Sequence, residues 1–356
     1  MRKPPTPSGV YATAVSGWPG HILAATRAYG PGHGGPLTHR LLEVDGHTVT
    51  VTDPDRRLHG DHGPSKAEVL TYYMTVAPRL LPYLRGRAVS TILWPDDSTP
   101  ELRFARTMPA RCSPRFASYR LGGVVRPQVE RYVTVPDKGT LAALADCGCL
   151  SFHPWNSTAD APLQPTQMVF NLDPEAIAFR EVRQAALLLR TLLADGRLTA
   201  WVKTSGRQGL HVLVPLDGNA SFDDARVTAD TIVNHAIRRE PKLFTRDPRR
   251  GRRRGRILLD TSRNERGATL IAPYAIATSG LVSAPLAWDD LHRPIYPDEF
   301  DMERIAARAA VDADNSAALP AAEQSLQRLL SGIRRRCSTR ESGDAAQLSS
   351  GSSVRR

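Results

Sequence analysis

Four polar residues stand in or at the end of apolar runs that otherwise read as buried strands. Asn171 and Asp173 belong to VFNLDP, Asp260 closes RILLD, and His211 lies within GLHVLVPL. Residues two apart in a strand project from the same face of a sheet, which brings Asn171 and Asp173 side by side. One carboxylate on each of two neighbouring strands, with a histidine between them, is a layout that binds a divalent metal ion and a triphosphate.

A Gly-rich turn lies beside this histidine. SGRQG separates the apolar segments 199–205 and 209–216, and a short turn between two such runs predicts a β-hairpin. The backbone amides of a Gly-rich turn can bind a phosphate, and a neighbouring imidazole can donate a hydrogen bond to it. Ser205 and His211 therefore flank a candidate phosphate-binding turn.

Each of these residues also has a plainer explanation when taken alone. Asp173 precedes a proline, as turn and capping aspartates often do, and His211 on an apolar strand fits a core histidine with satisfied hydrogen bonds. Asp260 can likewise be explained as a structural residue or as a site residue. The run 238–256 holds ten Lys or Arg against two acids, which indicates a solvated loop by default. Its position just before the strand of Asp260 favours phosphate contact instead.

Strands and helices alternate along the chain, which predicts an α/β (α+β) fold with mixed β-sheets flanked by helices. The segment 65–84 opens with Ser65 and carries Glu68 three residues later, the pattern of a capping box before an amphipathic helix. Two further helices are predicted at about 175–194 and 222–238. Strands are predicted at 47–53, 88–94, 166–174, 199–205, 209–216, 254–260 and 269–277.

The composition is that of a folded, basic protein. Of 356 residues 41% are hydrophobic, which is enough for a full core, and the formal net charge is +11. Such a surplus favours polyanionic partners, although an Arg-rich composition alone would also produce it. No run of about 18 apolar residues is present and the N-terminus lacks the apolar centre of a signal peptide. We therefore expect a cytoplasmic, nucleoid-associated protein with no membrane span.

Three regions are expected. Residues 1–38 are rich in Gly, Pro and Thr and predict a loose N-terminal arm. Residues 39–317 form one globular domain. Residues 318–356 form a Ser-rich, basic tail that we expect to be disordered. Cys147 and Cys149 form C-x-C without a second ligand pair at zinc spacing, which favours free thiols.

Together these segments resemble a known family, the polymerase domain of bacterial non-homologous end-joining LigD, in the archaeo-eukaryotic primase superfamily. The resemblance runs in order from about residue 45 to 292. It implies a primase-polymerase fold and a DNA repair nucleotidyltransferase that adds ribonucleotides or other nucleotides at double-strand break ends. It rests on TDPDRRL, SKAEVLTYYMTVAPRLLPYLRGRAVS, FHPW, FNLDP, KTSGRQGLHVLVPL, RILLDTSRNERGATLIAPYAIA and APLAWDDL.

The resemblance implies a metal site. The family's Asp-x-Asp motif falls on Asn171 and Asp173, and its third metal carboxylate falls on Asp260. Two Mn²⁺ or Mg²⁺ ions would then lie between Asp173 and Asp260, with His211 as a further catalytic residue. Asn171 stands where the family has a metal-binding Asp, and a neutral amide is a poorer ligand than a carboxylate.

The resemblance also implies the nucleotide and DNA contacts. The motif that binds nucleoside triphosphates falls on Ser205, Gly206 and His211, and His153 matches another nucleotide-site histidine, although it equally fits a packing role in a His-Pro-Trp turn. Contacts to the 5′-phosphate of a DNA end and to the DNA chain fall on Arg56, Lys66, Phe104 and Arg106.

Further departures surround these positions. Arg103 replaces an aromatic residue beside Phe104, and Trp94 and Ala277 stand where the family usually has arginine. The loss of cationic residues would weaken the hold on a triphosphate or a template.

Three functions of different kinds follow. The first is a template-guided nucleotidyltransferase that works with a separate DNA ligase and a Ku-like end-binding protein. The second is a catalytically degenerate relative that binds DNA ends or nucleotides as a repair scaffold, which the change at Asn171 favours. The third is another small-molecule function on the same scaffold.

Overall fold

The computed structural model describes residues 21–28, 37–57, 63–94, 102–107, 118–121, 130–311, 324–326 and 330. Within the expected arm, His21–Ala28 forms strand β1, so this stretch is not loose, while residues 1–20 and 29–36 lie outside the described residues. Most of the expected tail 318–356 also lies outside them. No helix of the described part of the chain is long and apolar enough to span a bilayer.

The described elements alternate in type, as the sequence predicts. The helices are α1 (Lys66–Leu84), α2 (Lys138–Asp146), α3 (Phe179–Asp195), α4 (Phe222–Arg239) and α5 (Met302–Val311), with 3₁₀ turns η1 (Ser262–Asn264), η2 (Trp288–His292) and η3 (Pro297–Glu299). The strands are β1 (His21–Ala28), β2 (Leu37–Val44), β3 (His47–Thr52), β4 (Val89–Leu93), β5 (Arg103–Ala105), β6 (Ser118–Leu121), β7 (Glu130–Val133), β8 (Cys149–Pro154), β9 (Gln167–Asp173), β10 (Trp201–Thr204), β11 (Leu210–Pro215), β12 (Phe244–Thr245), β13 (Ile257–Asp260) and β14 (Pro285–Leu286).

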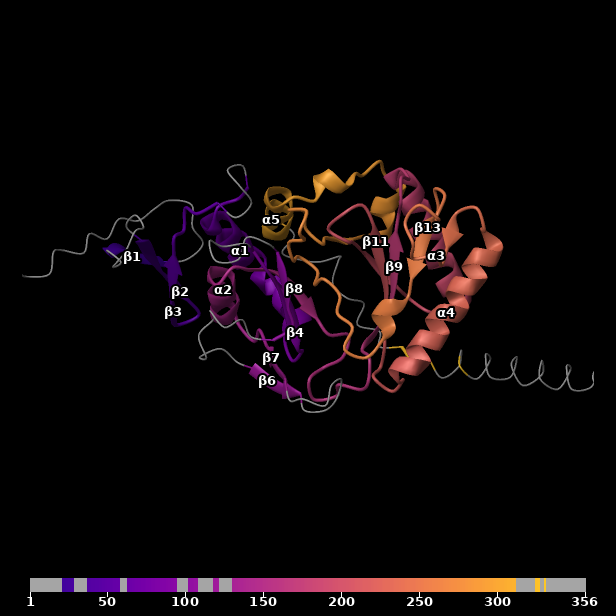
Figure 1. Ribbon diagram of the computed structural model, residues 1–356, viewed down its shortest axis with the longest axis horizontal. Helices are drawn as coiled ribbons and strands as arrows, with labels where there is room; N and C mark the ends of the chain where they lie inside the picture. The colour runs from indigo at the N-terminus through magenta and orange to yellow at the C-terminus, as the bar shows by residue number, and fades with distance from the viewer. Residues whose placement is uncertain are drawn as a thin grey trace, which may run out of the picture.

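These strands form three sheets. A small antiparallel sheet has the order β1-β2-β3, and a five-stranded sheet contains β5-β4-β7-β6 with β8 paired to β4. The largest sheet has six strands in the order β12-β13-β9-β11-β10-β14, and only its β12–β13 pair is parallel. In Figure 1 the first two sheets lie with α1 and α2 on the left, and the six-stranded sheet lies on the right. The architecture confirms the expected α+β class with mixed sheets.

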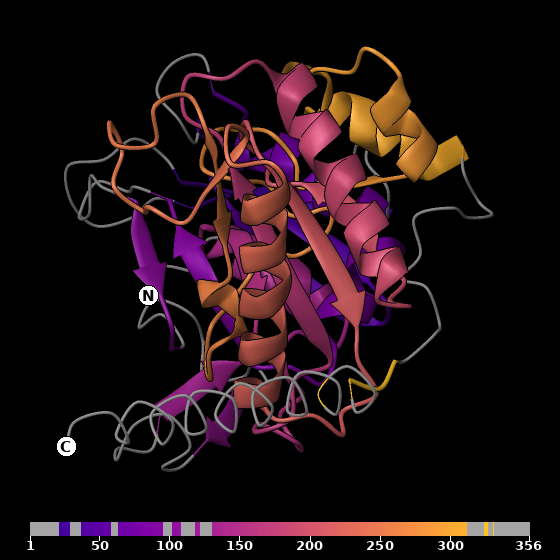
Figure 2. The same cartoon turned by 90° about the vertical axis from the view of Figure 1, so that its right-hand side faces the viewer.

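The six-stranded sheet has two different faces. Helices α3 and α4, prominent in Figure 2, pack against β9 and β11 on one of them. Alternate strand residues such as Phe170, Leu172 and Val212 are buried in the main core on that side. Because side chains alternate, Asn171, Asp173 and His211 must point to the opposite face.

Helix α1 ties the two halves of the molecule together. It begins at the predicted place, since Ser65 and Glu68 form a complete capping box. The hydroxyls of Tyr72 and Tyr73 donate to the carbonyls of Tyr274 and Leu150, which belong to opposite halves of the chain.

Two predicted elements differ from the structure. Helix α3 begins at Phe179 and not near 175, because Ala176 has a positive φ of 53° that a helix cannot include. The segment 269–277 is not a regular strand. Leu270 and Ala272 donate backbone hydrogen bonds to β8, but Pro273 has no N–H and Tyr274 has a φ of 67°, so the ladder stops there.

Candidate active site

Four side chains form a row across the six-stranded sheet, on the face away from α3 and α4. Asp260 of β13 lies directly opposite Asn171 of β9, which lies opposite His211 of β11. His211 in turn lies opposite Lys203 of β10. Directly opposed residues share a face, and Asp173 follows two residues beyond Asn171 on that face. The structure thus brings together the four residues with which the sequence argument began, on strands that Figure 1 shows side by side. We call the set of Asp260, Asn171, Asp173, His211 and Lys203 the catalytic row.

The two carboxylates of the catalytic row already have partners. One oxygen of Asp260 accepts from the backbone N–H of Ser262 at 2.8 Å, and the other accepts from the amide of Asn171 at 3.4 Å. Asp173 accepts from the guanidinium of Arg253 at 2.9 Å. Arg253 also donates to the backbone carbonyls of Asp173 and Pro248, and only 3% of it is exposed. Any cation that binds Asp173 through this oxygen must compete with Arg253.

The donor set fits one divalent cation. Asp173 and Asp260 offer two carboxylates, and Asn171 lies directly opposite Asp260 and two residues from Asp173 on the same sheet face. Mg²⁺ is commonly held by one or two carboxylates together with water and substrate phosphates. Among the described residues no group of three or more His, Cys, Asp and Glu side chains could hold a metal alone. Water and phosphate would therefore complete the coordination.

Two histidines face the site as neutral rings. Burial, with the charges of Lys203 and Arg263, lowers the pKa of His153 to about 3. Burial, with the same two charges and His153, also lowers the pKa of His211 well below its ordinary value. Nε2 of His153 lies 2.9 Å from Oγ of Ser151. The charges of Lys203 and Arg263 act on both rings, which indicates that β8 brings His153 close to the catalytic row.

The turn between β10 and β11 is closely packed. Gly206 has a φ of +73°, and a Cβ there would overlap the Cβ of Ala277. The hydroxyl oxygen of Ser205 accepts from the backbone N–H groups of Arg207 and Gly209, at 3.2 and 3.1 Å. These contacts hold Ser205 and Gly206 in a fixed turn beside His211. Ala277, where the family usually has arginine, fills the space against this turn with a methyl group.

The residues expected to contact DNA lie in two places. Phe104 on β5 is 50% exposed, and its ring meets His153 edge-on at 5.9 Å. Arg106 follows β5 and is exposed. Arg56 and Lys66 lie instead at the start of α1, where the backbone N–H of Lys66 donates to the carbonyl of Arg56.

Lys66 is not a free surface cation. Only 6% of it is exposed, and its ammonium donates to Asp146 at 3.1 Å and to the hydroxyl of Thr52 at 3.0 Å. Burial among these partners ties α1 to β3 and α2. A DNA phosphate would have to share Lys66 with Asp146, whereas Arg56 is half-buried.

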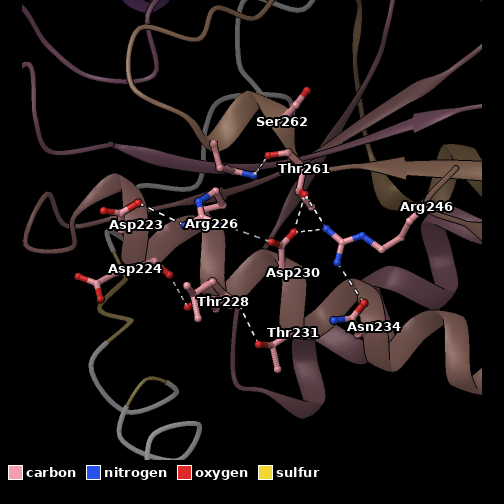
Figure 3. A network of polar contacts seen from close by, with 12 residues as sticks. Asp223, Asp224, Arg226, Thr228, Asp230, Thr231, Asn234, Arg246, Thr261 and Ser262 are labelled. Carbon is pink, nitrogen blue, oxygen red and sulfur yellow. Dashed lines mark hydrogen bonds and ion pairs between the residues drawn. The ribbon is translucent and has the colours of Figure 1, made fainter. Parts of the chain in front are cut away.

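Sequence reasoning missed three features of the site. Two of them are buried basic side chains: Lys203, which belongs to the catalytic row and lies 2.8 Å from His211, and Arg253, which donates to Asp173. The third feature is a cluster around Asp230 on α4, shown in Figure 3. Asp230 accepts from the hydroxyl of Thr261 at 2.7 Å and pairs with Arg246, and Thr261 follows Asp260 directly. The alternation of polar residues in TAWVKTS could have pointed to Lys203, because it lies two residues before Ser205.

The basic run 238–256 is divided between these contacts and solvent. Arg246, Arg249 and Arg253 pair with acidic residues of the chain, whereas Arg250 and Arg252 are exposed. The run is therefore partly structural, and its exposed members border the strand of Asp260.

Comparison with known proteins identifies the family of the chain. The family model described as "LigD, primase-polymerase domain" matches residues 65–316. The "Multifunctional non-homologous end joining protein LigD" of Mycolicibacterium smegmatis is 31% identical over 252 residues, which are 69% of this chain and 33% of that protein. Its namesake in Pseudomonas aeruginosa is 31% identical over 269 residues, or 73% of this chain and 31% of that protein. The chain thus spans about a third of the length of these curated relatives.

A solved structure shares the fold. The polymerase domain from Mycobacterium tuberculosis ligase D, in complex with DNA, superposes with a TM-score of 0.68 and 27% identity. The match covers 75% of this chain and 96% of that one. These matches show that the chain belongs to the LigD primase-polymerase domain family.

Proposed function

We propose that this chain is a template-guided nucleotidyltransferase that extends the 3′ end at a DNA double-strand break during non-homologous end joining. The observation that carries the proposal is the catalytic row, which places Asp173, Asn171 and Asp260 beside His211 on one sheet face. The names of the relatives, which are end-joining proteins, support the pathway. The DNA complex of the similar polymerase domain supports DNA as the substrate.

The residues of this chain bind and orient both reactants in this proposal. A Mg²⁺ or Mn²⁺ ion held by Asp173, Asn171 and Asp260 would supply positive charge for the triphosphate and lower the pKa of the attacking 3′-hydroxyl. His211 donates its N–H to a phosphate oxygen, and the turn at Ser205 orients the triphosphate for in-line attack.

The same proposal assigns the nucleotide and DNA contacts. His153 and Gly206 border the nucleotide, and Gly206 lets the backbone approach its phosphates because it carries no side chain. Phe104 offers an exposed ring on which a base can stack, with Arg106 beside it for the phosphate chain.

At the other position, Arg56 and Lys66 would bind the 5′-phosphate of the downstream strand. Asp146 keeps Lys66 in place and competes with that phosphate.

The reaction implies partners. Extension leaves a nick, which a DNA ligase must seal, and the ends must be held together, as a Ku-like protein would do. We place the protein at the nucleoid in the cytoplasm, where its charge of +11 favours contact with DNA.

A primer-extension assay tests the function. A labelled primer–template with a 5′-phosphorylated downstream strand is incubated with Mn²⁺ or Mg²⁺ and with ribonucleotides or deoxyribonucleotides. We expect metal-dependent extension by the wild type, and Asp260→Ala should abolish it without loss of DNA binding. If the wild type and Asn171→Asp both bind the DNA and neither extends it, the polymerase assignment fails and a scaffold role replaces it.

A further inference from the structure

Lys203 ends the catalytic row and has no role in the reaction described above. Its side chain is 0% exposed, although a lysine is rarely fully buried without a partner. Its Nζ lies 2.8 Å from Nδ1 of His211 and 2.6 Å from Oγ of Ser283. Neither of these partners is a carboxylate, so Lys203 forms no salt bridge with them.

The hydrogen bond between Lys203 and Ser283 has a defined direction. The hydroxyl of Ser283 donates to the backbone carbonyl of Thr204 at 2.8 Å, so its oxygen accepts from Lys203. The side chain of Thr204 is itself bonded to two backbone groups of the segment that contains Ser283. These bonds fix Lys203 between β10 and the segment that precedes β14. Lys203 has a further N–H that can donate to Nδ1 of His211, 2.8 Å away.

A donor at Nδ1 decides which nitrogen of the ring carries the proton. When Nδ1 accepts a hydrogen bond, a neutral imidazole bears its hydrogen on Nε2. We propose that Lys203 is a positioning residue that holds His211 as its Nε2–H tautomer and aims that N–H at the phosphates of a bound nucleoside triphosphate. The inference rests on the proposed function, because it takes His211 to be a triphosphate ligand.

The use of a cation at this position has a chemical consequence. A carboxylate, the usual partner of a functional histidine, would accept from the ring and stabilise an imidazolium. Lys203 does the reverse, and with burial it lowers the pKa of His211. His211 therefore acts as a neutral hydrogen-bond donor and not as a general acid. A bound polyanion favours the ammonium form of Lys203, which can only donate to Nδ1.

The tautomer is measured first in the wild-type protein. Long-range ¹H–¹⁵N correlation spectra of ¹⁵N-histidine-labelled protein distinguish the two ring nitrogens, and His211→Gln assigns the signals. We expect the hydrogen of His211 on Nε2 both without nucleotide and with a non-hydrolysable ribonucleoside triphosphate. A hydrogen on Nδ1 in the wild type overturns the proposal.

The second measurement removes the donor. Lys203→Met keeps the length of the side chain without its N–H groups, and Lys138→Met, on α2 where Lys138 pairs with Asp45, is the matched control. With loss of one hydrogen bond to the ring, we expect Kd and KM for the triphosphate to rise about tenfold and kcat to change far less. A folded Lys203→Met protein that binds triphosphate as the wild type does contradicts the proposal.

A milder variant covers the case in which Lys203→Met does not fold. Ser283→Ala removes the second partner of Lys203 and leaves the lysine in place. We expect the Nε2–H signal of His211 to weaken and Kd to rise about threefold, a fraction of one hydrogen bond. An unchanged tautomer population with unchanged Kd contradicts the proposal.

These readouts separate the two proposals. Wild-type protein that extends DNA but carries its hydrogen on Nδ1 refutes the role of Lys203 alone. Wild-type protein with Nε2–H that binds triphosphate through His211 but never extends DNA refutes the polymerase assignment and supports the role of Lys203.

Discussion

Asn171 changes the charge of the catalytic row by one unit compared with the aspartate usual in the family. Its amide donates to Asp260 at 3.4 Å, a contact that a second carboxylate could not make without a cation. An aspartate there would instead repel Asp260 in the metal-free protein. The amide thus removes repulsion between the two side chains and would reduce the charge available to hold a metal.

Asn171→Asp should therefore increase both the affinity of the protein for the metal ion and the dependence of its stability on that ion. We expect the apparent affinity for Mn²⁺ in primer extension to rise at least about tenfold, because a third carboxylate adds a full charge to the site. The metal-free variant should unfold at a lower temperature than the wild type. Mn²⁺ should raise the Tm of the variant by more than it raises the Tm of the wild type. Metal titrations followed by extension and by thermal unfolding measure both effects. Asn219→Asp, at an exposed position before α4, is the control.

Arg253 is the second residue that sets the state of the site, because it binds an oxygen of Asp173. Arg253→Met should free Asp173 for a cation and lower the metal concentration at half-maximal extension. It should also cost about 1–3 kcal/mol of stability, since the carbonyls of Asp173 and Pro248 lose a donor. The exposed Arg252→Met is the matched control. Equal metal dependence of wild type and Arg253→Met would show that Arg253 does not compete with the cation.

At the scale of elements, most of the site was predictable because it depends on local pattern. The capping box at Ser65, the hairpin around SGRQG and the strands that carry Asn171 and Asp260 all follow from spacing and polarity. The alignment of four strands in one register was not predictable, because it is set by packing against α3 and α4. Lys203 and Arg253 are buried by tertiary contacts that the sequence pattern alone does not show.

The cluster around Asp230 shows how one element supports another. Asp230 on α4 holds Thr261, the residue after Asp260, and Arg246 from the basic run (Figure 3). Asp230→Ala should lower the free energy of unfolding by about 1–2 kcal/mol, because two donors lose a charged acceptor. It should also slow extension by loosening the end of β13. Asp223→Ala, at an exposed site about two turns earlier on α4, should change neither. Chemical denaturation and extension rates of the two variants measure the difference.

At the scale of the whole molecule, we expect two neutral histidines, the buried His211 and the partly buried His153, to make stability depend on pH. The pKa of His153 is lowered to about 3, below the value near 6.5 of an unfolded histidine. Between these values the unfolded chain binds a proton that the folded chain does not. The free energy of unfolding should therefore fall as pH drops below about 6.5, by up to about 1.4 kcal/mol per pH unit for each such histidine.

Urea denaturation between pH 7.5 and 5 tests this dependence. His153→Gln removes one of the two titrating groups, so the slope of stability against pH should be smaller than in the wild type. His292→Gln, at the exposed end of η2, is the control and should keep the wild-type slope. Identical slopes for the wild type and His153→Gln would contradict the burial of a neutral His153 in the folded protein.

The central claim is that the catalytic row transfers nucleotides, and a single-turnover measurement tests it most directly. Wild type and Asp260→Ala are each saturated with a 5′-phosphorylated gapped DNA, and the rate of one ribonucleotide addition is followed after mixing with Mn²⁺ and a triphosphate. Saturation removes differences in DNA binding. We expect incorporation by the wild type and a rate at least about 100-fold lower for Asp260→Ala, as when a metal-binding carboxylate is lost. Equal rates, or none in the wild type, would contradict the account.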